Sequence, residues 1–314
     1  VQEVVEPHTR RHNILVTIAN EHHIDPLTHV ALAVAQEKHS AIWGMHAVQV
    51  PDIVPIGSSR EIAMEKQDLL QKASATVGSE VPFNWMLRAT HDVGRAIQDS
   101  IRRKDIDLLV MGWPTKGAPD SKASPLGRTL QWVLERLLCD LFLVRLDETT
   151  DTLDFSTTVV PVRPLHRGAQ SRFAVETARL MTEAAGGQVH FVHVAYKGED
   201  VDLPALGELA GLDPEEIIIV RADKSSLSTA GVVDNVLRYA QEVQATALIV
   251  GATEEGIISR RLHGSVPVEL AHHFHGSFLL TKKYSGPVRS YLQEFFGSRP
   301  TEHLSDVETM VERD

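Results

Sequence analysis

Two glycine-containing loops have the residue types and spacing that suit the binding of a phosphate group. Each follows an apolar run that is typical of a buried strand and precedes a segment with helical spacing. The candidate binding residues are Gly112, Gly117, Gly127 and Thr129 in the first loop, and Gly251, Gly264, Ser265 and Val266 in the second. Glycine lets the backbone approach a phosphate closely, and the free N–H groups at a helix start attract an anion. The same glycines equally suit a structural role, in which they only end strands and begin helices.

Neither loop, nor any other segment, carries a motif for catalysis or metal binding. Gly117 precedes Ala118 and Gly256 precedes Ile257, whereas a Walker A loop requires Lys and then Ser or Thr. No Gly-x-Ser-x-Gly, His-Glu-x-x-His or Cys-x-x-Cys pattern occurs. Among 16 histidines, His272 and His275 have helical spacing but belong to no zinc-finger pattern. We therefore expect no catalytic residues and no metal site.

Some aromatic and imidazole side chains near these loops have a structural and a functional interpretation. Trp113 directly follows Gly112 and could stack on a base, but packing of the indole on its own loop is favoured. His46, His190 and His193 alternate within apolar runs, and we expect their polar atoms to be satisfied near a sheet.

The elements that position the two loops repeat along the chain. Five short apolar or β-branched runs are expected as strands in each half, at 12–18, 42–48, 83–89, 106–112 and 141–145, and again at 158–162, 189–194, 217–221, 247–251 and 277–281. Helical patterns separate them, the first starting with Asp25 as N-cap and Pro26 as the first helical residue. The order predicts an α/β fold with two tandem doubly wound five-stranded parallel sheets, whose fifth-strand edges are buried against each other.

Length and composition limit the number of domains and the class of protein. The 314 residues contain 43% hydrophobic residues, enough for two domains with sizeable cores. The net charge of −11 argues against a nucleic-acid binder, and the single cysteine, Cys139, excludes a disulfide framework. No apolar run has the length of a membrane span.

The predicted domains are residues 1–150, 151–284 and 285–314. The last segment begins with Gly286-Pro287 and continues with an apolar stripe at helical spacing, followed by an acidic end. We expect a helix over 288–296 with a buried face formed by Val288, Tyr291, Leu292 and Phe295.

Each tandem unit ends with a strand, a glycine-containing loop, a Gly-Ser or Gly-Arg-Thr sequence and a helix. Over residues 12–146 and 157–282 the two units resemble the universal stress protein family. The resemblance implies a fold like that of the adenine nucleotide alpha hydrolases. Nucleotide-binding members carry Gly-x2-Gly-x9-Gly-Ser/Thr after the fourth strand and an Asp after the first. In the second half Glu254 stands at the middle glycine, and in the first half Gly112 is two positions early and Arg128 replaces Ser/Thr. The first-strand Asp is absent, with Ala19 and Arg163 nearest to its position.

These departures bear on the ligand that the resemblance implies, which is ATP, AMP or a cyclic adenine dinucleotide. Glu254 would repel a phosphate, an effect that Arg163 could offset. A degenerate, purely structural pair is the favoured interpretation. A nucleotide that does bind is expected at a loop after the fourth strand, with its base near Val48 or Val194.

A second resemblance concerns the context of the chain. The opening His12–Val16, the tandem arrangement and the segment 283–289 are similar to the C-terminal cytosolic regions of amino acid–polyamine–organocation permeases. Since the chain begins with Val1 instead of Met, it is expected to be a domain cut from such a transporter.

The resulting prediction is a non-catalytic regulatory module at the inner face of the cell membrane. Its expected partners are the transmembrane domain of the same chain and a second copy in a homodimer. The alternatives are a free-standing nucleotide-binding universal stress protein and a weak ATPase. We expect ATP hydrolysis to be negligible.

Overall fold

The parts of the chain that the computed structural model describes are residues 12–53, 67–114, 128–146, 152–163, 168–223, 228–252 and 265–286. Gly117, Gly127, Gly264 and the predicted tail helix at 288–296 lie outside these ranges. Within them, no helix is both long and apolar enough to cross a membrane. Both halves belong to one compact unit, which ends at Lys283.

The first half alternates strands and helices as its apolar runs predict. Its elements are β1 (Asn13–Thr17), a 3-10 turn η1 (Glu21–His23), α1 (Ile24–Lys38), β2 (Ala41–Gln49), α3 (Gln67–Val77), β3 (Phe83–Thr90), α4 (Val93–Arg103), β4 (Leu108–Pro114), α5 (Arg128–Glu135) and β5 (Asp140–Leu146). The predicted start of α1 is wrong by two residues: the N-cap is His23, and Asp25 lies in the first turn. The preceding turn η1 feeds directly into the helix, so Asp25 is already helical.

The second half repeats this order. It consists of β6 (Thr157–Pro161), α6 (Ala169–Ala184), β7 (Gln188–Tyr196), α7 (Leu203–Ala210), a 3-10 turn η3 (Pro214–Glu216), β8 (Ile217–Ala222), α8 (Thr229–Glu242), β9 (Ala247–Gly251), α10 (Val266–His273) and β10 (Ser277–Lys282). Helices α8 and α7 begin with side-chain caps, in which Ser228 and Asp202 accept a hydrogen bond from the backbone N–H three residues later.

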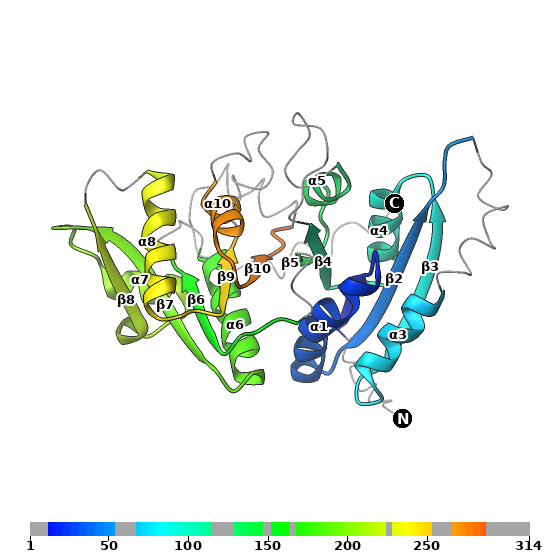
Figure 1. Ribbon diagram of the computed structural model, residues 1–314, viewed down its shortest axis with the longest axis horizontal. Coiled ribbons are helices and arrows are strands. Elements are labelled where there is room, and N and C mark those ends of the chain that lie inside the picture. The colour runs from blue at the N-terminus through cyan, green and yellow to red at the C-terminus, as the bar shows by residue number, and fades with distance from the viewer. Residues whose placement is uncertain are drawn as a thin grey trace, which may run out of the picture. The chain divides into compact units, whose positions relative to one another are not determined.

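All strands join in one sheet, in the order β3-β2-β1-β4-β5-β10-β9-β6-β7-β8 (Figure 1). Each half is a doubly wound, parallel five-stranded unit, as predicted, and its strand order is 3-2-1-4-5. The expectation of two separate sheets needs correction, because β5 and β10 pair antiparallel, with Leu279 opposite Val144. This pairing gives two edge strands hydrogen-bond partners that they would otherwise lack.

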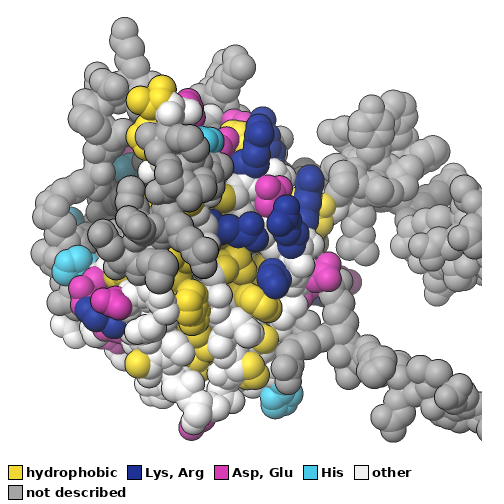
Figure 2. All heavy atoms as spheres, turned by 90° about the vertical axis from the view of Figure 1, so that its right-hand side faces the viewer, with side chains coloured by type: hydrophobic (Ala, Val, Ile, Leu, Met, Phe, Trp, Pro, Cys, Tyr) yellow, Lys and Arg dark blue, Asp and Glu magenta, His cyan; other side chains and the backbone are white. Residues whose placement is uncertain are grey.

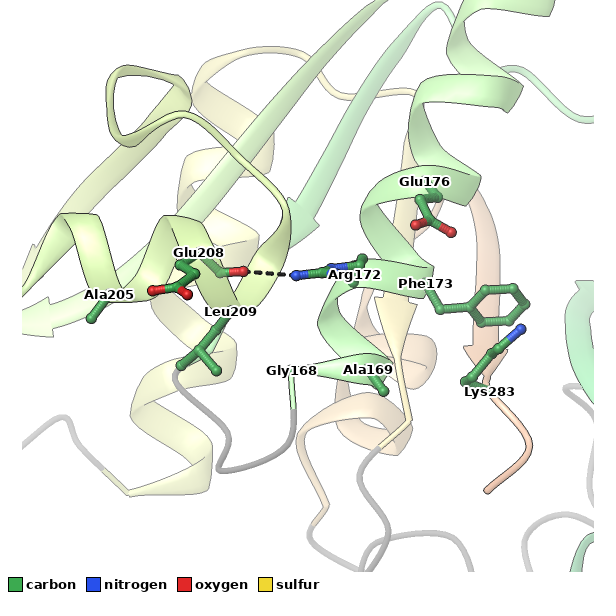
Figure 3. Close-up of a pocket in the computed structure, with 9 residues that line it drawn as sticks. All are labelled: Gly168, Ala169, Arg172, Phe173, Glu176, Ala205, Glu208, Leu209 and Lys283. Atoms are coloured by element: carbon green, nitrogen blue, oxygen red, sulfur yellow. Dashed lines mark hydrogen bonds between the residues drawn. The ribbon is translucent and has the colours of Figure 1, made fainter. Parts of the chain in front are cut away.

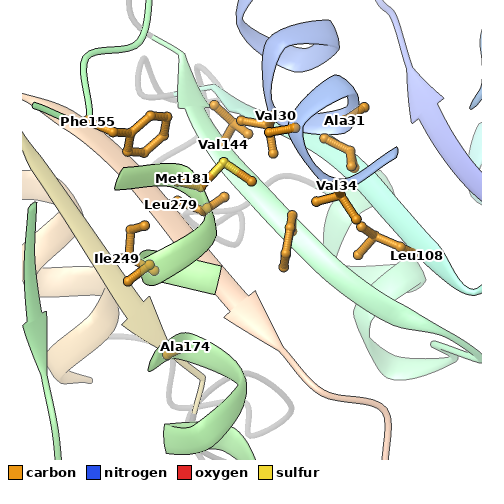
Figure 4. Close-up of a cluster of buried hydrophobic side chains, with 14 of the residues drawn as sticks. Val30, Ala31, Val34, Leu108, Val144, Phe155, Ala174, Met181, Ile249 and Leu279 are labelled. Atoms are coloured by element: carbon orange, nitrogen blue, oxygen red, sulfur yellow. The ribbon is translucent and has the colours of Figure 1, made fainter. Parts of the chain in front are cut away.

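The two faces of the sheet carry separate apolar cores. Along β1, Ile14 and Val16 face one core and Leu15 faces the other, which is the two-residue period of a strand covered on both sides. Helices α1, α3, α6 and α7 cover the first core, and α4, α5, α8 and α10 cover the second. Figure 4 shows that the first core contains side chains of both halves, among them Val30 and Val34 from α1, Met181 from α6, Val144 from β5 and Leu279 from β10.

A buried arginine joins the two halves on the second face. Arg145, on β5, is 5% exposed and donates from Nη1 to the carbonyl oxygen of Ala271 at 2.6 Å. It also donates to the carbonyl oxygens of Phe274 and Gly276. These carbonyls lie at and just beyond the carboxyl end of α10, where the helix dipole favours a positive charge. The first half therefore caps a helix of the second.

The outer edge of the first half is β3. Figure 2 shows Lys and Arg side chains gathered beside an apolar stretch on this face. Trp85 on β3 is 41% exposed, and Arg95, Arg102 and Arg103 are exposed on the neighbouring helix α4. Charged side chains beside an edge strand oppose its pairing with another chain.

Candidate functional site

The carboxyl edge of the second half holds three of the predicted binding residues. Gly251 ends β9, Ser265 is the N-cap of α10, and Val266 is the first residue of that helix, as the sequence predicts. Ser265 has extended backbone angles, and its hydroxyl makes no capping hydrogen bond to the helix. The hydroxyl and the N–H groups of Val266 and Val268 can bind an anion at this helix start, although Pro267 between them has no N–H.

Gly251 is required by packing. A Cβ atom at this position would lie 3.0 Å from the carbonyl oxygen of Gln170 and 3.5 Å from the Cβ of Ala174, both on α6. The side chain of Gln170 is buried; it donates to the carbonyl oxygen of Lys283 at 2.9 Å and accepts from the N–H of Lys283 at 2.8 Å. The first turn of α6 is thereby fixed against the ends of β9 and β10, which explains this glycine without a ligand.

Two buried histidines hold equivalent places in the two halves. His46 on β2 and His193 on β7 are both 6% exposed. The Nδ1 of His46 lies 2.7 Å from the carbonyl oxygen of Ile18, and the Nδ1 of His193 lies 3.0 Å from that of Val162. Because a carbonyl oxygen only accepts, Nδ1 carries the hydrogen in each ring.

Each histidine of this pair anchors the chain just after the first strand of its half. The third histidine of the predicted set, His190, is 2.9 Å from the hydroxyl of Tyr239. All three imidazoles therefore have partners near the sheet, as expected from their alternation.

The first half differs at the corresponding edge. Gly112 does not end its strand, because β4 continues through Trp113 to Pro114 and pairs with β5 to its end. The indole of Trp113 is 2% exposed and packs edge-on against Phe278 of β10, with ring centroids 6.1 Å apart. The buried ring is not available to stack on a base, and the loop on which its packing was predicted lies at 115–127, outside the described residues. Thr129 lies in the first turn of α5.

The residues at the missing acid position are exposed. Ala19 follows β1, and Arg163 follows β6 with its side chain open to solvent. The carbonyl oxygen of Arg163 accepts from the hydroxyl of Ser171 at 3.4 Å. Arg163 is thus placed at the same edge as Ser265, at the end of a strand that pairs with β9.

The described residues contain no group of three or more His, Cys, Asp or Glu side chains placed to hold a metal ion. His272 and His273 are exposed near the end of α10, and His273 lies 3.7 Å from Glu269. Cys139 is buried, and burial raises the pKa of its thiol to about 12. Such a thiol is a poor nucleophile and a poor metal ligand at neutral pH.

Two cavities flank helix α6 and were not predicted. The larger, about 560 Å³, lies between the start of α6, helix α7 and Lys283 (Figure 3). Arg172 crosses it and donates to the carbonyl oxygen of Glu208 at 2.9 Å. The smaller, about 300 Å³, lies between α1, α6 and the junction of the halves. None of the predicted binding residues that the structure describes lines either cavity.

Comparison with known proteins identifies the fold. A universal stress protein from Archaeoglobus fulgidus superposes with a TM-score of 0.60, covering 86% of this chain and 96% of that one at 16% sequence identity. A proposed universal stress protein from Pseudomonas aeruginosa gives a TM-score of 0.54, covering 91% and 98% at 13% identity. The chain has the universal stress protein fold.

The comparison by sequence found a similarity to part of an antiporter. No family model matches the chain. The Na(+)/H(+) antiporter NhaS5 from Synechocystis is 22% identical over 192 residues, which are 61% of this chain. The match spans only 27% of the antiporter.

Proposed function

We propose that this chain is a non-catalytic regulatory module of a membrane transporter and that it binds an adenine nucleotide at the carboxyl edge of its second half. The observation that carries the first part is the antiporter match, which joins this fold to a protein several times longer than the matched region. On this proposal the antiporter and the permease resemblance point to the same arrangement, a cytoplasmic module beside a transmembrane domain. The transported solute is left open between an ion and an amino acid.

The nucleotide part of the proposal rests on the geometry of one edge. The hydroxyl of Ser265 makes no capping hydrogen bond, so the hydroxyl and the start of α10 suit a phosphate. Arg163 supplies a positive charge at the end of β6. The base would lie near Val194, on the neighbouring strand β7. The second half is preferred over the first, despite Glu254 in its loop, because the extended β4 and the buried Trp113 alter the first half's edge.

A non-catalytic role fits the side chains at this edge. His193 is 6% exposed and donates its Nδ1–H to the Val162 carbonyl oxygen, so a structural role at this edge accounts for it. Ser265 has a hydroxyl, and nothing among its described contacts would remove its proton.

The organisation into residues 1–150, 151–284 and 285–314 is part of the same proposal. The predicted homodimer would have to use surfaces other than β5 and β10, because these strands pair within the chain.

Calorimetric titration with ATP, AMP and a cyclic adenine dinucleotide tests nucleotide binding. We expect saturable heat with at least one of them, and its loss in Ser265→Asp. Aspartate is as good an N-cap as serine, so this variant keeps the helix start and adds a charge that repels phosphate. Thr129→Asp in the first half is the matched control and should bind as the wild type does.

Two results would contradict the nucleotide proposal. The absence of heat with all three nucleotides would leave the glycines with a structural role only. Loss of binding in Thr129→Asp but not in Ser265→Asp would move the site to the first half.

One observation favours the free-standing alternative. The match to the Archaeoglobus protein covers 96% of that chain, so a comparable tandem fold exists there without a transporter sequence in the same structure. The size of the native protein decides between the transporter module and the free-standing protein.

A further inference from the structure

The smaller cavity beside α6 has an apolar and aromatic floor. Phe142 from β5 and Phe173 from α6 line it together, with ring centroids 5.6 Å apart. Val34 and Leu108 from the first half complete the floor. Both halves thus contribute to one hollow of about 300 Å³, a size at the lower end of small-molecule sites.

The wall of this cavity is rich in carboxylates. Glu37, Glu176 and Glu183 line it. Of the basic residues there, Arg179 donates to both carboxylate oxygens of Glu216 at 2.7 and 2.8 Å. Burial lowers the pKa of His12, so its imidazole is neutral at neutral pH. Asp140 is a fourth carboxylate of the lining and pairs with Lys283, and Lys38 lies beside the three glutamates, so the cavity keeps an excess of negative charge.

An alkylammonium group of the protein itself already occupies a neighbouring position. The Nζ atom of Lys283 lies 2.7 Å from Oδ2 of Asp140 and 4.9 Å from the ring centroid of Phe173. Figure 3 shows the end of the Lys283 side chain beside that ring, with Glu176 on the same helix. An ammonium is therefore stabilised here by a carboxylate and an aromatic face together.

We infer that the cavity between α1 and α6 is a binding site for a small organic cation, a primary amine or guanidinium on a short apolar body. The apolar body would lie on Phe142 and Phe173, and the charged group would lie among Glu37, Glu176 and Glu183. The lining includes none of the residues of the proposed nucleotide site. A ligand held there contacts both halves at once, so its binding tightens their junction.

The test is calorimetric titration of the purified chain with n-pentylamine and 1,5-diaminopentane at physiological ionic strength. Their matched probes are 1-pentanol and pentanoate, which keep the chain length and remove or reverse the charge. We expect the amines to bind and the alcohol and the anion not to bind. The paired variants Glu176→Gln and Glu183→Gln should each weaken amine binding about fivefold or more. Both side chains are exposed, so neither change should unfold the protein.

Asp234→Asn is the control for total charge, because Asp234 is exposed on α8, a helix of the opposite face. It should leave amine binding unchanged. Amines that give no heat, 1-pentanol that binds as well as the amines, or equal weakening by Asp234→Asn would each overturn the inference. Nucleotide titration of the same samples is an independent readout, so failure of one proposal is distinguishable from failure of the other.

Discussion

Replacing Arg145 by methionine should be among the most destabilising single changes at the junction of the two halves. Methionine retains much of the apolar stem but provides no hydrogen-bond donor. Arg145 is 5% exposed and donates to three carbonyl oxygens near the end of α10. Without the guanidinium, these oxygens have to find other donors or remain unsatisfied.

The expected loss in the free energy of unfolding depends on which of these carbonyl oxygens water cannot reach. Ala271 and Phe274 are buried, at 3% and 8% exposure, whereas Gly276 is partly exposed and can be hydrated. At about 2 kcal/mol for each buried acceptor left without a donor, the loss is about 4 kcal/mol. For a unit of this size, each kcal/mol corresponds to about 2–3 °C, so the melting temperature should fall by about 8–12 °C.

Differential scanning calorimetry of the wild type, Arg145→Met and Arg179→Met measures this effect. Arg179 is the matched control because it forms an ion pair with Glu216 on the surface, where its side chain is 47% exposed. Such pairs contribute about 0–1 kcal/mol. If Arg145→Met lowers the melting temperature no more than Arg179→Met does, the proposed capping of α10 by the first half is refuted.

Four further changes test other parts of the structure. The thiol of Cys139 has a pKa of about 12, so only about one molecule in ten thousand carries the thiolate at pH 8. A thiol-specific colorimetric reagent should therefore label Cys139 only when the protein unfolds. Rapid labelling of the native protein would contradict the burial of this side chain. The pKa of His12 is lower in the folded than in the unfolded state, so the unfolded state takes up a proton first as pH falls through about 6.5, and stability declines. The urea midpoints at pH 8 and pH 5 should therefore differ less in His12→Gln than in the wild type. An equal difference would refute this. Gly251→Val should cost about 2 kcal/mol in the free energy of unfolding, because its Cβ alone would lie 3.0 Å from the Gln170 carbonyl oxygen; an unchanged denaturation midpoint would refute the close packing of α6 there. Deletion of residues 287–314 should lower the melting temperature or change the mass in solution if the predicted tail helix buries its apolar stripe; if neither changes, that burial is excluded.

The fold was predictable because its signals are local and occur twice. The five apolar runs of each half match the observed strands within one or two residues at most ends, and the parallel pairing within each half follows from the alternation of strands and helices. The joining of β5 and β10 into one sheet was less accessible. The sequence indicates that the edge strand of each half must be protected from solvent. It does not show whether this protection comes from hydrogen-bonded pairing with another strand or from packing against another element.

The candidate site was less predictable, since its residues acquire their roles from distant parts of the chain. Gly251 is explained by Gln170 on α6, and Trp113 packs on Phe278 from the other half. Neither partner can be inferred from spacing. The histidine pair could have been found, because His46 and His193 occupy the same place in the second strand of each half.

The cavity beside α6 had no signal in the sequence for a different reason. Its floor brings Phe142 and Phe173 together across the junction, and Lys283 reaches Asp140, a residue far away in sequence. These contacts depend on how the two halves meet, which is the feature that repeat analysis leaves undetermined.

The size and location of the native protein test whether this chain is a module of a membrane transporter. An antibody raised against the purified 34.7 kDa chain should be used on membrane and soluble fractions of the cells that make the protein. If the chain is such a module, the antibody should detect a single species in the membrane fraction with a mass well above 34.7 kDa. A species of about 34.7 kDa in the soluble fraction, with none in the membrane, would contradict it and establish the free-standing alternative.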